Sequence, residues 1–188
     1  MRPEDSLDII ANMMSQTRRN VIQGSYWPFL LWGWSSVVVG LATYVAVSLT
    51  ADPRAYLLWL FLPVIGCTGL ACHRNRRQPS VRTSISTSLH SIWKMLTIVL
   101  VCFSVTSYLV HFNVLFFILL ILSVGCYVTG AIIAYPLLRN ASVAGFLIAA
   151  SLWFVGGPKQ ILVFLIAIVA MMIIPGYIMK QDLRNERT

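Results

Sequence analysis

The segment QILVFLIAIVAMMIIPGYIM, residues 160–179, carries no charged side chain over twenty consecutive positions. About 20 helical residues cross the hydrocarbon core of a bilayer, so this segment predicts a transmembrane helix. A helix is favoured because every backbone N–H and C=O must find a partner where there is no water. The chain shows no run of segments of about ten residues with alternating polarity, which a transmembrane barrel would need.

The rest of the chain has the same character. Of its 188 residues, 58% are hydrophobic and only 11% are charged, whereas a soluble domain is roughly a quarter charged. This composition excludes a disordered chain and a disulfide-rich secreted scaffold. It predicts an all-α polytopic membrane protein with six transmembrane helices, at about residues 27–50, 55–72, 92–110, 114–135, 137–155 and 160–179.

The basic residues predict the orientation of these helices. Of the 14 Lys and Arg residues, all except Arg54 and Lys159 fall on one side of the six-helix topology. Loops that remain in the cytoplasm carry an excess of Lys and Arg. We therefore expect a multi-pass protein of the bacterial inner membrane, with both termini in the cytoplasm.

The predicted organisation is a cytoplasmic arm, residues 1–25, a transmembrane domain, residues 26–180, and a cytoplasmic tail, residues 181–188. Within the arm, residues 5–22 place polar and apolar side chains on opposite arcs at helical spacing. This pattern predicts a short amphipathic N-terminal helix on the cytoplasmic surface. It favours an interfacial anchor in the headgroup zone, and the alternative is a docking surface for a cytoplasmic partner.

The longest polar connection, residues 73–91, contains no acidic residue. Its simplest interpretation is a determinant of topology. Both this connection and the arm carry arginines that could contact anionic lipid headgroups or a protein partner. Because the connection has no aromatic side chain on which a base could stack, we expect no direct contact with nucleic acid. The candidate contact residues for lipid or partner are Arg18, Arg19, Arg74, Arg76, Arg77 and Arg82.

Catalytic and ion-coupling groups are missing from the predicted spans. All six acidic residues lie outside them, and proton-coupled transporters usually carry ionisable groups inside the bundle. The chain has none of the common nucleophile, zinc or phosphate-loop motifs. Its four cysteines, among them Cys102 and Cys126 near mid-depth, are expected to be free thiols. We therefore predict no catalytic residue, no metal, no cofactor and no enzymatic activity.

Small and hydroxyl residues are the remaining signal inside the spans. Ser36 and Gly40, Gly125 and Thr129, and the row of Ala141, Gly145 and Ala149 repeat at intervals of four. This spacing lets helices approach closely; it favours packing within the chain, and a dimer interface or ligand groove is the alternative. Helices 92–110 and 114–135 have the densest polar content. The candidate ligand cavity there comprises Ser104, Ser107, Ser123, Tyr127 and Thr129.

Three motifs mark a resemblance. They are the N-terminal Leu-Asp-Ile-Ile at residues 7–10, the Leu-Trp-Gly-Trp entry to the first span at residues 31–34, and Ile-Pro-Gly-Tyr at residues 174–177. In these motifs and in overall length, the chain resembles a family of small six-helix inner-membrane proteins of Gram-negative bacteria. Genes of that family often lie beside those of winged-helix transcription regulators, so the resemblance implies a cytoplasmic regulatory partner.

Together these observations favour a non-enzymatic inner-membrane sensor or scaffold that works with a cytoplasmic protein. The alternative is a small oligomeric transporter or channel subunit without proton-coupling carboxylates. The expected partners are membrane lipids, a cytoplasmic regulatory protein and, in the alternative, further copies of this chain.

Overall fold

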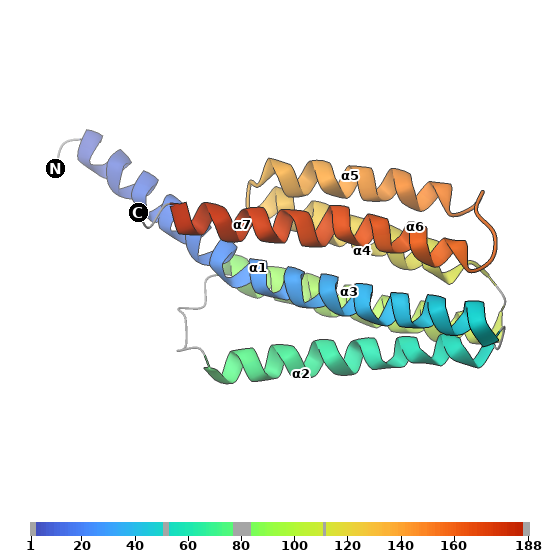
Figure 1. Ribbon diagram of the computed structural model, residues 1–188. Coiled ribbons are helices and arrows are strands. Elements are labelled where there is room, and N and C mark those ends of the chain that lie inside the picture. Colours follow the sequence, from blue (N-terminus) through green and yellow to red (C-terminus); the bar gives the residue numbers. More distant parts are fainter. Residues whose placement is uncertain (1–2, 51–52, 77–83, 111, 186–188) are drawn as a thin grey trace.

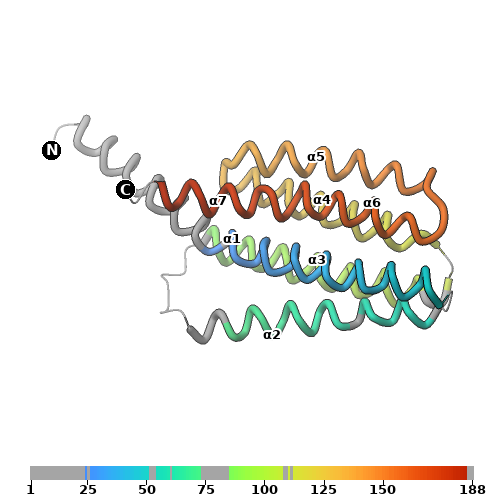
Figure 2. Tube along the Cα trace, viewed as in Figure 1, coloured from blue at the N-terminus to red at the C-terminus, as the bar shows by residue number. Residues whose placement is uncertain are grey.

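The structure is a computed structural model that describes residues 3–50, 53–76, 84–110 and 112–185. Figure 2 colours the residues whose side chains are described together with the backbone. Almost all of the described residues are helical, and they contain no strand. The predicted all-α class is therefore confirmed.

The helical segments of the described residues run in alternating directions along the bundle (Figure 1). They are α1 (Pro3–Thr50), the 3₁₀ helix η1 (Pro53–Leu60) leading into α2 (Phe61–Arg76), α3 (Ser84–Leu109), α4 (Val114–Ile132), α5 (Pro136–Ser151), and α6 (Lys159–Ile168), which continues through the π-helix η2 (Val169–Ile173) into α7 (Ile174–Asn185). Five of the helices are long and apolar enough to cross a membrane: Tyr26–Thr50, Arg54–Cys72, Ile85–Ser107, Val114–Ile132 and Lys159–Asn185.

The helix in the fifth predicted span is shorter than expected, because α5 contains 16 residues and ends at Ser151 instead of residue 155. Three successive hydrogen bonds of the tighter i→i−3 type close this end, the first from the N–H of Leu152 to the carbonyl of Ala149 at 3.0 Å. The carbonyl of Leu152 then accepts hydrogen bonds from the side-chain amides of Asn113, at 3.1 Å, and Gln160, at 3.3 Å. Because the side chains of Asn113 and Gln160 hydrogen-bond to this carbonyl, it does not need a partner from a further turn of helix, which explains why α5 ends before residue 155.

The first helix is longer than expected. Where the sequence predicted an arm helix and a separate first span, the backbone of α1 is one helix of 48 residues with Pro28 inside it. Pro28 removes a single N–H from the helical ladder, and the helix continues through it. The side chains of residues 1–23 lie outside the described part of the chain, so the amphipathic surface of the arm stays a prediction.

The second helical segment changes its helix type next to Pro63. The 3₁₀ helix η1 ends at Leu60 and the α-helix α2 begins at Phe61. Pro63 has no N–H to donate to the carbonyl of Trp59, four residues earlier, and its ring crowds that carbonyl. The change of hydrogen-bond pattern therefore falls in the turn that this proline disturbs.

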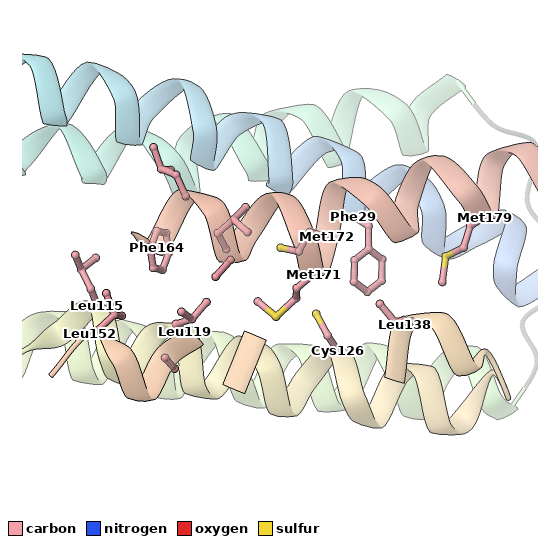
Figure 3. Close-up of a cluster of buried hydrophobic side chains, with 14 of the residues drawn as sticks. Phe29, Leu115, Leu119, Cys126, Leu138, Leu152, Phe164, Met171, Met172 and Met179 are labelled. Carbon is pink, nitrogen blue, oxygen red and sulfur yellow. The ribbon is translucent and has the colours of Figure 1, made fainter. Parts of the chain in front are cut away.

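The last helical segment is the centre of the packing. It contacts α1 on one side and α4 and α5 on the other, while α3 packs on α4 and α2 packs on α1. Side chains from the last segment and from α4 point into a common apolar core (Figure 3). The largest fully buried side chains include Leu119, Leu138, Leu152, Ile161, Phe164, Met171 and Met179.

The second and third spans are covered least by the rest of the molecule. Only 6% of the apolar window in Arg54–Cys72, and 6% of that in Ile85–Ser107, is buried inside the chain, against 56% for Lys159–Asn185. Most of the apolar surface of α2 and α3 therefore faces outward.

Candidate functional site

The structure divides the five residues of the predicted ligand cavity into two groups. Ser123 and Thr129 of α4 are buried, with 2% and 0% exposed. Tyr127, on the same helix, is 43% exposed. On α3, Ser104 is exposed and Ser107 is half-buried, and the Ser104 hydroxyl donates to the carbonyl of Leu100 at 2.8 Å. Ser123 and Thr129 share the inner side of α4, whereas Ser104 and Tyr127 face outward.

The space beside Ser123 is filled by Met171. The Ser123 hydroxyl donates to the carbonyl of Leu119 at 2.8 Å and lies 3.4 Å from the Met171 sulfur. A Cβ on Gly145 would lie 2.8 Å from that sulfur and 3.0 Å from the Ser123 oxygen. The thioether therefore occupies a notch between α4 and α5 that exists because residue 145 has no side chain. Figure 3 shows Met171 pointing toward α4, near Cys126.

A second buried hydroxyl joins α3 to α4. The indole N–H of Trp93 donates to the Thr129 hydroxyl oxygen at 3.1 Å, and that hydroxyl donates to the carbonyl of Gly125 at 2.7 Å. The Trp93 ring also meets Phe29 of α1 edge-on, with centroids 6.1 Å apart. Here α1, α3 and α4 meet around one indole, and its polar atom is paired inside the bundle.

The π-helix η2 is a feature of the interior that the sequence did not predict. The N–H of Ile174 donates to the carbonyl of Val169, five residues back, and Met171, Met172 and Ile173 are buried. Such π segments in α-helices often mark functional sites. The sequence feature that indicates a distorted helix here is Pro175. A proline ring clashes with the carbonyl four residues earlier, and that carbonyl belongs to Met171. Widening the helix just before the proline relieves this clash.

Glycines from two helices flank the π segment. A Cβ on Gly33 of α1 would lie 2.7 Å from Cγ1 of Ile173. On the opposite side, Gly145 of α5 faces Met171 as described above. The small residues at intervals of four therefore serve packing within the chain at these positions, and they close the middle of the bundle around η2.

The turn between α4 and α5 is held in an uncommon conformation. Ala134 has φ +53°, and the N–H of Tyr135 donates to the carbonyl of Gly130 at 2.8 Å, as in the Schellman ending of a helix. Pro136 then begins α5. The turn directs Tyr135 toward α7, where its hydroxyl donates to the Asp182 carboxylate at 2.6 Å.

The end of the bundle that contains Tyr135 and Asp182 also carries several cationic side chains. Arg139 of α5 and Lys180 and Arg184 of α7 are exposed here, and Lys94 is exposed on the half of α3 nearer this end. The side chains of Arg18, Arg19, Arg74 and Arg76 lie outside the described part of the chain, as do Arg77 and Arg82 altogether. The opposite end, where α1 and α3 finish, carries Arg54 and Lys159.

Metal-binding and redox groups form no cluster in the described part of the chain. No three His, Cys, Asp or Glu side chains come together there in a way that could hold a metal ion. The four cysteines are free, and only Cys126 is buried while Cys67, Cys72 and Cys102 are exposed.

Two surface hollows lie away from the predicted cavity. One, of about 380 Å³, lies between the end of α1 and the start of the second span, and it is lined by Ala46, Thr50, Arg54, Ala55, Leu57, Leu58 and Phe61. The other, of about 600 Å³, lies on α7 and is lined by Tyr177, Lys180, Gln181, Arg184 and Asn185.

Comparison with protein-family models, with curated proteins and with solved structures finds no match to this chain. The geometry described above is therefore the ground for the proposal that follows.

Proposed function

We propose that this protein is a non-enzymatic sensor or scaffold of the bacterial inner membrane that works through a cytoplasmic protein partner. The observation that carries this proposal is the closed middle of the bundle. Met171 fills the notch between Ser123 and Gly145, and the hydroxyls of Ser123 and Thr129 donate to carbonyls of their own helix. A solute path along α3 and α4 would need polar groups that are open to water. The ends of the bundle are then the working surfaces.

The proposal includes six crossings with both termini in the cytoplasm. In support, α5 lies against α4 and α6 at the edge of the bundle, and its ends meet opposite ends of the molecule. Its 16 residues span about 24 Å as an α-helix, and the exposed Trp153 and Phe154 extend the apolar length.

The distribution of charge supports the orientation. The end with Arg139, Lys180 and Arg184 also holds the end of α2 and the start of α3, so it carries the basic connection between them. By the positive-inside rule, this end faces the cytoplasm. The arm at residues 1–25 and the connection at 73–91 are then available to a cytoplasmic partner. A regulatory protein as that partner is what the family resemblance in the three sequence motifs implies.

Site-specific crosslinking in native membranes tests the partner. A photoreactive amino acid replaces Arg19 in the arm or Arg82 in the connection, and Lys159 at the opposite end serves as the matched control. We expect one protein to be enriched by quantitative mass spectrometry at the first two positions and not at the third. If no protein is enriched on residues 1–25 or 73–91, the proposal is wrong.

One observation favours the alternative, a small oligomeric transporter or channel subunit without proton-coupling carboxylates. Because α2 and α3 are barely covered within one copy, several copies could meet there. Hydroxyls on the outward side of α3, those of Thr97 and Ser104, would then line a path between copies. Crosslinking between copies through the exposed Cys102 tests this arrangement, and a monomer in native membranes excludes it.

A further inference from the structure

The hollow on α7 has a polar and cationic lining. It measures about 600 Å³, and the described residues of its lining include two cations, Lys180 and Arg184, and no carboxylate. Both cations are exposed and stand one helical turn apart. Side chains four positions apart on a helix lie on the same face, so one ligand can contact both.

The Asp182 carboxylate, on α7, lies on a different side of the helix from this hollow. Asp182 is the acidic side chain that the structure describes on α7, and it follows Lys180 by two positions, or about 200° around the helix axis. Its carboxylate accepts a hydrogen bond from the Tyr135 hydroxyl at 2.6 Å. The turn between α4 and α5 therefore holds the Asp182 carboxylate on the far side of α7. There it does not neutralise Lys180 and Arg184.

The exposed side of the last helical segment changes in character toward this hollow. Ile166 and Ile174 are 63% and 49% exposed, and Tyr177, one turn further, is 47% exposed and accepts a hydrogen bond from the Trp34 indole N–H at 3.3 Å. Tyr and Trp prefer the boundary between hydrocarbon and headgroups. One face thus presents apolar, aromatic and cationic side chains in the order in which a phospholipid presents its acyl chains, glycerol and phosphate.

We propose that this face binds one anionic phospholipid, with its phosphate between Lys180 and Arg184 and its acyl chains along Ile174 and Ile166. Gln181 also lines the hollow and offers an amide donor to the headgroup oxygens. The site depends on the membrane embedding of the bundle and not on the cytoplasmic partner proposed above. It uses neither the arginines of the arm nor those of residues 73–91.

Native mass spectrometry of the purified full chain tests the site. The measurement is the binding preference for phosphatidylglycerol over phosphatidylcholine with the same acyl chains. Each Lys or Arg close to an anionic lipid contributes about 1 kcal/mol, equivalent to about fivefold in affinity. We therefore expect K180Q/R184Q to lower this preference roughly 25-fold, and each single change to lower it about fivefold.

The matched control is K94Q/R139Q, which removes the same charge from the same end without changing the lining of the hollow. This variant should keep the preference of the unchanged chain. Equal losses in both double variants would show diffuse surface attraction and overturn the proposal, and so would no loss in either. Displacement of the lipid by millimolar inorganic phosphate would show that the hollow binds free phosphate instead. Because the protein is purified, the result does not depend on whether a protein partner exists.

Discussion

Ala134 and Gly157 adopt the left-handed backbone conformation, with φ +53° and +65°, and each lies in a turn of the C-terminal half. The cost of this conformation is roughly 1–2 kcal/mol for a residue with a Cβ and is nearly absent for glycine. Ala134 incurs that cost in the turn that directs Tyr135 toward Asp182, whereas Gly157 avoids it in the connection between α5 and α6. The two positions thus form a natural pair for measuring backbone strain.

We expect Ala134→Gly to stabilise the protein by about 1 kcal/mol and Gly157→Ala to destabilise it by a similar amount. Gly157 is suitable because a Cβ there would meet no atom within 4 Å, so the change acts through the backbone alone. The measurement is reversible unfolding in mixed micelles. Shifts of the same sign in the two variants would contradict this account of the turn.

At this scale the sequence identified polar residues but not the directions in which they point. Ser123 and Tyr127 are four positions apart on α4, yet one is 2% and the other 43% exposed. Side chains four positions apart lie on the same side of a helix, so the difference in exposure comes from the helices packed around α4. A membrane helix is apolar on every side, so its sequence carries little information about which face is buried. Trp93 shows the same limit, because the sequence does not indicate that its indole N–H donates a hydrogen bond to Thr129 inside the bundle.

At the scale of elements, prolines and glycines lie at several of the breaks between helices. Pro136 begins α5, and residues 156–158 separate α5 from α6. The small residues were also informative, since Ser36 and Gly40 are buried and a Cβ on Gly40 would lie 2.6 Å from Leu165. The π-helix was not predicted, because Pro175 has several ways to distort a helix and only the packing around it selects one.

The close approach of α4 to α5 depends on Gly130. A Cβ there would lie 2.9 Å from the backbone nitrogen of Arg139, and a backbone cannot move aside as a flexible side chain can. We expect Gly130→Ala to destabilise the protein by about 1–3 kcal/mol. Gly24→Ala in α1 is the control, since nothing lies within 4 Å of its Cβ. An unchanged melting temperature for Gly130→Ala would show that the two helices are not in close contact.

The π-helix predicts an unusual tolerance of deletion. A single-turn π segment amounts to one extra residue in an α-helix, so deletion of Ala170 allows η2 to become α-helical while both flanks keep their register. Deletion of Val163 from α6 instead rotates its neighbours by about 100°. We expect the first variant to keep a monodisperse profile in size-exclusion chromatography and the second to aggregate. Equal damage by both deletions would contradict the assignment of η2.

At the scale of the whole molecule, hydropathy predicted which segments are apolar but not their places in the bundle. Tyr26–Thr50 has a mean hydropathy of 1.7 and is 44% buried, whereas Arg54–Cys72 has 1.9 and is 6% buried. Lipid is as apolar as a protein core, so hydropathy alone does not drive a helix to the centre. Close contacts at Gly33, Gly40 and Gly145 bring α1 and α5 against the last helical segment, and these contacts can be read only from the structure.

The central claim is that the bundle is closed in its middle and presents its basic end to the cytoplasm. The most direct measurement is the labelling of single cysteines by a water-soluble maleimide, in intact and in opened cells, on a background without the four native cysteines. We predict that Ser123→Cys and Thr129→Cys stay unlabelled in both, that Lys159→Cys reacts in intact cells, and that Arg139→Cys reacts only in opened cells. Labelling of Ser123→Cys or Thr129→Cys in the folded protein would reveal a water path through the bundle and contradict the claim.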